Sequence, residues 1–210
     1  MNLRPSKIVC VGRNYVDHAK ELGNEVPKAP LLFLKAPSAL IGPDEPIVLP
    51  RESNQVEHEA EIGVVIGSRL QGANRRDAEK GIRGFVCLND VTARDLQLAD
   101  GQWTRAKGFD TFCPAGPRVA EGLHWKDLEV VGRVNGVERQ RGKATDMVFP
   151  IPELVSYISD IMTLMPGDLI ATGTPAGVGP LKPGDIVEVE VTGVGILRNP
   201  VAAHRAGSSA

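Results

Sequence analysis

The sequence predicts a mixed-β fold with short helices (α+β), built as a single domain. Glycine and proline are frequent, at 23 and 16 of 210 residues, and both residue types interrupt helices and form tight turns. Aromatic residues are few (Phe 5, Trp 2, Tyr 2), so the core must consist mainly of Val, Ile and Leu. Many short apolar runs, separated by turn residues, are typical of strands and not of a helical bundle.

Strands and short helices alternate in the first half of the chain. The clearest strand, residues 59–67, reads EAEIGVVIG, with apolar residues at every second position. A short helix is expected over 14–22, where Asn14 can act as the N-cap and Gly23 can end the helix. The other expected elements here are strands at 7–12, 31–34, 47–49 and 84–89 and helices at 75–82 and 92–98.

The second half is expected to contain further strands and one longer helix. Residues 129–135 run into Asn135-Gly136, a dipeptide typical of hairpin turns. A helix is expected from 152 to about 161, and strands at 168–172 and 185–192. We assign residues 1–200 to one domain and residues 201–210, which are small and polar, to a flexible tail.

Composition and charge argue against several classes of protein. The chain has 24 Lys+Arg and 26 Asp+Glu, a net charge of −2, and no basic stripe that would bind nucleic acid. No apolar run approaches the roughly 20 residues of a membrane span, and the beginning of the sequence does not read as a signal peptide. We therefore expect a cytoplasmic protein without nucleic-acid or membrane partners. Cys10, Cys87 and Cys113 form no CxxC pair and are interpreted as buried apolar residues.

Two carboxylates share one face of the clearest strand. Side chains alternate along a strand, so Glu59 and Glu61 face the same way as Gly63, and Ala60 and Ile62 face the core. Like charges on neighbouring positions need a cation or solvent. Gly63, and Gly67 further along, are expected to leave room for a bulky group in front of the carboxylates.

A third carboxylate, Asp90, directly follows the apolar strand at 84–89. Three hard oxygen ligands suit Mg²⁺, Mn²⁺ or Ca²⁺, and the absence of a paired histidine or thiolate argues against zinc. The alternative is a solvent-facing acidic stripe, which is how we interpret Glu188 and Glu190.

Five segments resemble the fumarylacetoacetate hydrolase family. They follow one another in order over nearly the whole chain, and together they are highly specific. The segments are VGRNYVDHAKELG (11–23), HEAEIGVVIG (58–67), NDVTARDLQ (89–97), WTRAKGFDTFCP (103–114) and TGTPAGVGPLKPGD (172–185). The resemblance implies a catalytic domain with a β-roll around a metal cleft, assembled as a homodimer or higher homo-oligomer. It also implies that Glu59, Glu61 and Asp90 bind Mg²⁺ or Mn²⁺.

The resemblance gives roles to residues that would otherwise be assigned to the surface. Lys107 is expected to point into the cleft and to neutralise an enolate. Arg94 and Gln97, which share a face of a helical turn, are expected to contact the substrate. The segment TGTPAGVGP lacks the G-K-[ST] ending of a phosphate-binding loop. Thr174 is instead expected to bind the substrate carboxylate through its hydroxyl or amide, where Gly173 and Gly177 let the backbone approach.

His18 and Glu21 lie three residues apart on the first expected helix. One interpretation is a surface pair that stabilises the helix slightly. The other, implied by the resemblance, is a lid helix in which Glu21 orients His18 to activate water. We favour the catalytic interpretation.

These residues together predict a metal-dependent hydrolase or lyase acting on small anionic 2-oxo acids. A metal-stabilised enolate could serve C–C hydrolysis of acylpyruvates and decarboxylation of oxaloacetate-like substrates, and these reactions are favoured because His18 and Glu21 can activate water. The alternatives are a 2-hydroxyhepta-2,4-diene-1,7-dioate isomerase or keto–enol tautomerase of aromatic catabolism, and a non-catalytic metal- or ligand-binding module.

Overall fold

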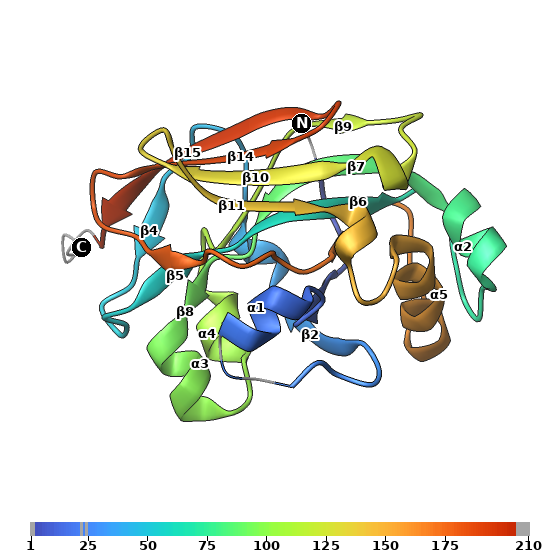
Figure 1. Cartoon of the computed structure of the whole chain (residues 1–210), viewed down its shortest axis with the longest axis horizontal. Coiled ribbons are helices and arrows are strands. Elements are labelled where there is room, and N and C mark those ends of the chain that lie inside the picture. Colours follow the sequence, from blue (N-terminus) through green and yellow to red (C-terminus); the bar gives the residue numbers. More distant parts are fainter. Residues whose placement is uncertain (1–2, 22, 24, 205–210) are drawn as a thin grey trace, which may run out of the picture.

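The chain folds into three sheets with short helices at their edges (Figure 1). The computed structural model describes residues 3–21, 23 and 25–204. Most of the regular structure is strand, which confirms the predicted fold class. No helix among these residues is long and apolar enough to cross a membrane.

The largest sheet contains the strand that carries the two glutamates. Its order is β2 (Leu31–Lys35), β1 (Ile8–Gly12), β12 (Leu169–Ala171), β6 (Ala60–Ile66), β7 (Ile82–Asn89), β9 (Cys113–Ala120) and β3 (Leu40–Ile41). Strands β6 and β7 are antiparallel, with Ala60 opposite Asn89. The backbone N–H of Asp90 donates to the carbonyl of Glu59 at 2.9 Å. This register brings Asp90 beside the two glutamates.

A second sheet packs across the first. Its order is β11 (Val137–Lys143), β10 (Glu129–Val134), β14 (Ile186–Val191), β15 (Gly195–Ala203) and β4 (Ile47–Leu49). The predicted inward residues of β6, from Ala60 to Ile66, meet Val130, Val189 and Leu197 of this sheet in the main core. The predicted turn at Asn135-Gly136 joins β10 to β11, a strand that was not itself predicted.

The opposite face of β6 is also buried, and its glycines have a different purpose from the one expected. Val65 packs there against Val86 and Leu88 of β7 in a second apolar cluster. A Cβ on Gly63 would lie 2.6 Å from Val86 Cγ2, and one on Gly67 would lie 3.1 Å from Arg83 Cβ. These glycines therefore admit neighbouring protein groups, and the prediction that they make room for a ligand is wrong.

Small elements close the ends of the two large sheets. The third sheet has the order β13 (Gly179–Pro180), β5 (Val56–His58) and β8 (Thr92–Ala93). The helices are α1 (Val16–Glu21), α2 (Arg75–Lys80), α3 (Arg94–Asp100), α4 (Thr104–Gly108) and α5 (Ile151–Ile161), with single 3₁₀ turns at Pro37–Ala39, Trp125–Asp127 and Ala144–Asp146. Helices α2 and α5 pack together at one end of the molecule (Figure 1). Helices α3 and α4 lie at another edge, beside β8.

The structure differs from the expected elements at several places, among them the predicted helix 92–98, where Thr92–Ala93 form β8 and α3 begins at Arg94, the predicted tail and the first helix. Strand β15 continues to Ala203, and Val201 pairs with Ile47 of β4, so the predicted tail begins later than residue 201; residues 205–210 lie outside the described part of the chain. Helix α1 begins at Val16, and Asn14 does not cap it. The buried Asn14 side chain instead accepts from Phe149 N at 2.9 Å and donates to Thr172 O at 2.8 Å. The predicted end of this helix falls on residues 22 and 24, which are outside the described residues.

Candidate metal centre and active site

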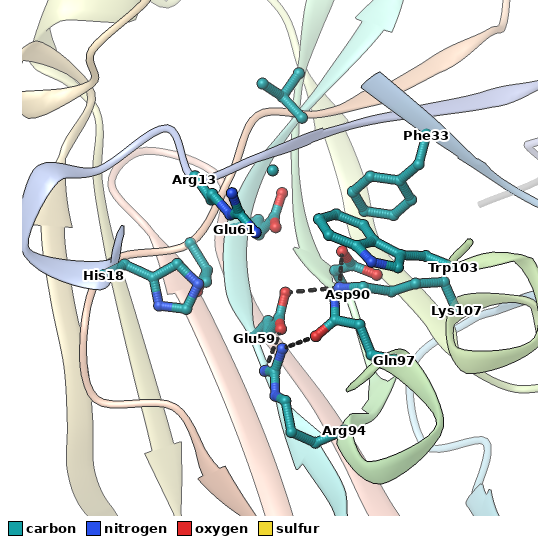
Figure 2. A pocket seen from close by; sticks show the side chains of 13 residues that line it. Arg13, His18, Phe33, Glu59, Glu61, Asp90, Arg94, Gln97, Trp103 and Lys107 are labelled. Atoms are coloured by element: carbon teal, nitrogen blue, oxygen red, sulfur yellow. Dashed lines mark hydrogen bonds and ion pairs between the residues drawn. The ribbon is translucent and has the colours of Figure 1, made fainter. Parts of the chain in front are cut away.

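The three predicted metal ligands meet at the bottom of a pocket. Glu59 lies between β5 and β6, Glu61 lies on β6, and Asp90 follows β7. One carboxylate oxygen from each lies within 4.8 Å of the others, and the side chains are almost completely buried. Figure 2 shows all three pointing towards the same space. Backbone pairing of β6 with β7 produces this convergence.

Three buried cations surround two of these carboxylates. Lys107 Nζ lies 2.6 Å from Asp90 and 2.9 Å from Glu59. Arg94 contacts Glu59 at 2.5 Å. Lys35 Nζ, at the end of β2, lies 2.6 Å from Asp90 Oδ1. The predicted approach of Lys107 to the cleft is thus observed, whereas sequence reasoning missed Lys35, whose only signal is a charge at the end of the apolar run LLFL.

Glu61 has no cationic partner among the described residues. Its one hydrogen bond comes from the backbone N–H of Gly173, at 2.8 Å. Burial, together with the negative charges of Asp90 and Glu59, raises the pKa of Glu61 well above its usual range. The pKa of Glu59 shifts in the opposite direction. Burial alone would raise this pKa, but the charges of Lys107 and Arg94 hold it below its usual range.

The donor set fits a divalent metal ion. Among the described residues Glu61 is a buried carboxylate without a counterion, and one oxygen of each of the two further carboxylates lies within 4.8 Å of one of its oxygens. Mg²⁺ and Mn²⁺ prefer oxygen ligands of this kind and commonly use only a few carboxylates, with other positions open to water or substrate. Glu59, Glu61 and Asp90 would hold the ion.

The walls of the pocket combine predicted and unexpected residues. Its empty volume is about 400 Å³, including the mouth. The predicted His18, Gln97 and Thr174 line it. Among the lining residues without a predicted role, Arg13, Phe33 and Trp103 have the largest side chains. Phe33 and Trp103 stack edge to face with ring centres 5.2 Å apart, so two of the few aromatic residues belong to the pocket.

Among the described residues that line the pocket, Arg13 is the arginine or lysine without an ion-pair partner. It follows β1 with a positive φ of 59°, and its guanidinium points towards Glu61 (Figure 2). Among the described residues it has no hydrogen-bond or ion-pair partner in the structure. The feature of the sequence that could have identified Arg13 is its position in the motif VGRNY. A half-buried, unpaired guanidinium in a pocket is suited to a carboxylate of a ligand.

Arg94 and Gln97, both predicted to contact substrate, line the pocket and are hydrogen-bonded to each other. Arg94 Nε donates to Glu57 at 2.8 Å, and its terminal nitrogens donate to Glu59 and to Gln97 Oε1, each at 2.5 Å. Each of the three guanidinium nitrogens therefore donates to a protein oxygen, and one of these oxygens belongs to the candidate metal ligand Glu59. Gln97 retains its amide nitrogen for a ligand.

Thr174 was expected to bind the substrate through its hydroxyl or its amide, and only one of these two groups is available. Its hydroxyl donates to Ala60 O at 2.8 Å and accepts from Gln140 Nε2 at 2.7 Å. Its backbone N–H has no partner among the described residues. The amide, and not the hydroxyl, is the group of Thr174 that a ligand can use.

The His18–Glu21 pair lies at the side of the pocket. His18 Nδ1 is 3.3 Å from Glu21 Oε2, and His18 is buried against the cavity. Glu21 also accepts from the backbone N–H of Gly177, at 3.0 and 3.2 Å. Helix α1 is thereby tied to the glycine-rich segment.

The two glycines of that segment are required by protein contacts. Gly173 and Gly177 have φ of 102° and 101°. A Cβ on Gly177 would lie 1.9 Å from Arg139 O, and one on Gly173 would lie 2.7 Å from Asn14 Cβ. Close packing against other parts of the chain therefore requires glycine at both positions, and the predicted approach of this backbone to a substrate stays a prediction.

A roll of strands around a pocket with three buried carboxylates defines a β-fold that can hold a divalent metal. The family model described as fumarylacetoacetate (FAA) hydrolase C-terminal matches residues 7–202, and the chain belongs to this family. The expected resemblance is thus confirmed.

Relatives and solved structures of this family are similar over most of the chain. An oxaloacetate decarboxylase of Dictyostelium discoideum is 45% identical, covering 90% of this chain and 89% of the relative. An oxaloacetate tautomerase of Bos taurus is 43% identical, covering 94% of this chain and 67% of the relative. The crystal structure of a 5-carboxymethyl-2-hydroxymuconate delta-isomerase from Mycobacterium smegmatis has a TM-score of 0.91 and 46% identity, covering 97% of this chain and 81% of that one.

Proposed function

We propose that the protein is a divalent-metal-dependent enzyme that decarboxylates oxaloacetate or closely related 2-oxo dicarboxylates. The observation that carries this proposal is Glu61, a buried carboxylate without a counterion, facing the same pocket as the unpaired guanidinium of Arg13. A metal ion would neutralise the carboxylate, and an anionic ligand would neutralise the guanidinium. The named decarboxylase among the relatives supports the same chemistry.

The residues of the chain would hold such a substrate by its charged ends. Arg13 can pair with one carboxylate, and the free N–H of Thr174 can donate to the same group. Gln97 offers its amide nitrogen further along the pocket. The bound ion would supply Lewis acidity at the 2-oxo group. The fixed ammonium of Lys107, held by Glu59 and Asp90, adds positive charge where the enolate develops.

Decarboxylation then needs only one proton transfer. The C3–C4 bond breaks, CO₂ leaves, and the bonding electrons remain in the enolate of pyruvate. A proton must then be added at C3. His18 lines the pocket beside Glu21, and such a pair can supply the proton as a general acid.

The same pair favours hydrolysis of acylpyruvates as a second candidate. In that reaction His18 would take a proton from water, the hydroxide would add at the C4 carbonyl, and the C3–C4 bond would break to give a carboxylic acid and the enolate of pyruvate. Both reactions share one enolate. The position of His18 next to the cavity, with Glu21 at 3.3 Å, is what supports this candidate.

Turnover measurements test the proposal directly. Oxaloacetate, acetylpyruvate and 2-hydroxyhepta-2,4-diene-1,7-dioate should be incubated separately with the protein and Mg²⁺, with Mg²⁺ alone to subtract the metal-catalysed background. We expect pyruvate and CO₂ from oxaloacetate, lost on chelation and in Glu61→Gln but kept in Glu188→Gln, which changes a half-buried glutamate of β14 outside the pocket. Reaction of the dienoate alone, or interconversion of keto and enol oxaloacetate without CO₂ release, would show that the enzyme is an isomerase instead.

A further inference from the structure

We infer that Gln140 is a positioning residue that holds the substrate-binding segment at a fixed place relative to the metal ligands; this inference rests on the proposed function. Gln140 lies on β11, in the second sheet, and is 1% exposed. It does not line the pocket. Its side chain extends from the second sheet to β6 and to the glycine-rich segment, and these two parts of the chain form the site.

Every hydrogen-bonding position of the Gln140 carboxamide is used. Oε1 accepts from Ala60 N and from His58 Nδ1, both at 2.9 Å. Nε2 donates to Thr174 Oγ1 and to Pro175 O, both at 2.7 Å. A carboxamide has two donor hydrogens and two acceptor positions, so no other orientation of the group satisfies all four partners.

These bonds close a ring around one residue of the metal strand. Ala60 lies between Glu59 and Glu61, and its N–H donates to Gln140. Its carbonyl accepts from the Thr174 hydroxyl, at 2.8 Å, and that hydroxyl accepts in turn from Gln140. The ring couples the position of the Thr174 backbone to the two glutamates. A change at Gln140 must therefore move the substrate-binding amide relative to the metal ligands.

The backbone around Gln140 is shaped to admit this side chain. The pairing of β10 with β11 shifts register after Gly132, which stands opposite Gln140. The three preceding residues of β11 are exposed, and the shift turns Gln140 inward, as β-bulges near active sites commonly do. A Cβ on Gly132 would lie 2.8 Å from Ala60 Cβ and 3.2 Å from Gln140 Oε1. Any other residue at position 132 would displace the carboxamide.

Measurements of ligand affinity distinguish a positioning role of Gln140 from a general structural role. The probes are Mn²⁺ alone and oxalate added to the Mn²⁺-loaded protein, because oxalate has the two adjacent oxygen-bearing carbons of a 2-oxo acid head. Gln140→Met removes all four bonds at similar length, and Gln140→Glu keeps the acceptors but loses both donors. We expect each variant to bind Mn²⁺ within about threefold of the wild type but oxalate at least about tenfold more weakly, the loss of roughly one hydrogen bond. The KM for oxaloacetate should rise by a similar factor, with a smaller change in kcat.

Arg139→Ala is the matched control, since Arg139 is the exposed neighbour on the same strand. It should bind oxalate as the wild type does. Thr174→Val removes the hydroxyl through which Gln140 acts, so the effects of Gln140→Met and Thr174→Val on oxalate affinity should be clearly less than additive.

The possible outcomes are distinct. Wild-type oxalate affinity in a folded Gln140 variant, or additive effects in the double variant, would overturn the inference. If one Gln140 variant fails to fold, the other, together with Thr174→Val, decides the question. If the wild-type protein decarboxylates no 2-oxo acid yet Gln140 variants lose oxalate affinity, the proposed reaction fails and the positioning role stands.

Discussion

At the scale of single residues, the two glutamates of β6 have opposite electrostatic environments. Glu59 has two cationic partners, Lys107 and Arg94, whereas Glu61 has only the N–H of Gly173. The lowered pKa of Glu59 contributes stability above the usual pKa of a carboxyl, and this contribution is lost as the pH falls. The raised pKa of Glu61 has the opposite effect. As the pH rises, ionisation of Glu61 lowers the stability of the metal-free protein.

Metal binding should therefore displace a proton from Glu61. Since a coordinating carboxylate must be ionised, Mn²⁺ affinity should rise with pH, by up to about tenfold per pH unit while Glu61 keeps its proton. Calorimetry at pH 5 to 8, in buffers of different ionisation enthalpy, measures both the affinity and the protons released. Glu61→Gln should bind the metal weakly and release no proton. Tight binding that is independent of pH and releases no proton would contradict this assignment.

Lys35 is the buried cation that sequence reasoning did not identify. Its ammonium is inaccessible and contacts Asp90 Oδ1 at 2.6 Å and Val91 O at 3.0 Å. Lys35→Met breaks a buried ion pair from one side, so it should lower the free energy of unfolding by about 3 kcal/mol or more. Urea denaturation of the metal-free protein measures this. Lys80→Met, at an exposed position of α2, is the control and should change stability by less than about 0.5 kcal/mol; equal stability of the two variants would mean that Lys35 is dispensable.

At the scale of elements, α1 connects the pocket to the glycine-rich segment. Its His18 faces the cavity, and its Glu21 accepts from both His18 and the N–H of Gly177. A shift of the segment would thus move the helix and the imidazole together. This arrangement is suited to a step that depends on a precisely held base.

The two candidate reactions should respond differently to loss of His18. Acylpyruvate hydrolysis needs a base to activate water, and general-base catalysis contributes about 10²–10⁴-fold. Loss of CO₂ needs no water nucleophile, and without His18 the enolate that it leaves can take its proton from solvent. His18→Asn should therefore reduce acetylpyruvate hydrolysis at least about 100-fold and oxaloacetate decarboxylation much less, as initial rates under saturating Mg²⁺ would show. Lys20→Ala, on the exposed side of the same helix, is the control. Equal losses in both reactions would contradict this, and would mean that protonation of the shared enolate by His18 limits both rates.

The sequence predicts elements well where the pattern is local. Strand β6 and the convergence of Glu59 and Glu61 follow from alternation within one run, and Asp90 follows from the end of an apolar run. Strand β9 was missed because it contains two prolines and a glycine, which normally exclude a strand. Strand β11 was missed because three exposed residues in succession precede Gln140, so the alternation is broken at the bulge.

Site residues were missed where their role depends on contacts between distant elements. Lys35 and Gln140 have no motif of their own, and only the packing of β2 and β11 near the site reveals them. Gly63 and Gly177 were assigned to the ligand because the close approach of Val86 and of Arg139 O is a property of the folded chain. Spacing along the sequence carries no information about these contacts.

At the scale of the whole molecule, one buried carboxylate joins the beginning of the described chain to its last third. Strand β1 pairs parallel with β12, and Asp168 stands just before β12. Its oxygens accept from the N–H and hydroxyl of Ser6, at 2.9 and 2.7 Å, from Lys7 Nζ at 2.6 Å, and from Met165 N at 2.8 Å. Because β1 also leads into Arg13 and α1, this junction fixes the edge of the sheet from which one wall of the pocket is built.

Loss of the Asp168 charge should weaken the whole fold in a pH-dependent way. Although burial opposes it, hydrogen bonding from Lys7, Met165 and Ser6 holds the pKa of Asp168 below its usual range. The carboxylate therefore contributes stability that is fully present above the ordinary pKa of about 3.9 and is lost as the pH falls from that value through the lowered pKa of the folded protein. Asp168→Asn should lower the free energy of unfolding by about 2–3 kcal/mol at pH 7, and the difference from the wild type should shrink towards pH 3. Urea denaturation across this pH range measures the difference in free energy of unfolding. The control is Asp160→Asn, at an exposed position. A difference that stays constant with pH would mean that the charge of Asp168 does not hold the two parts of the chain together.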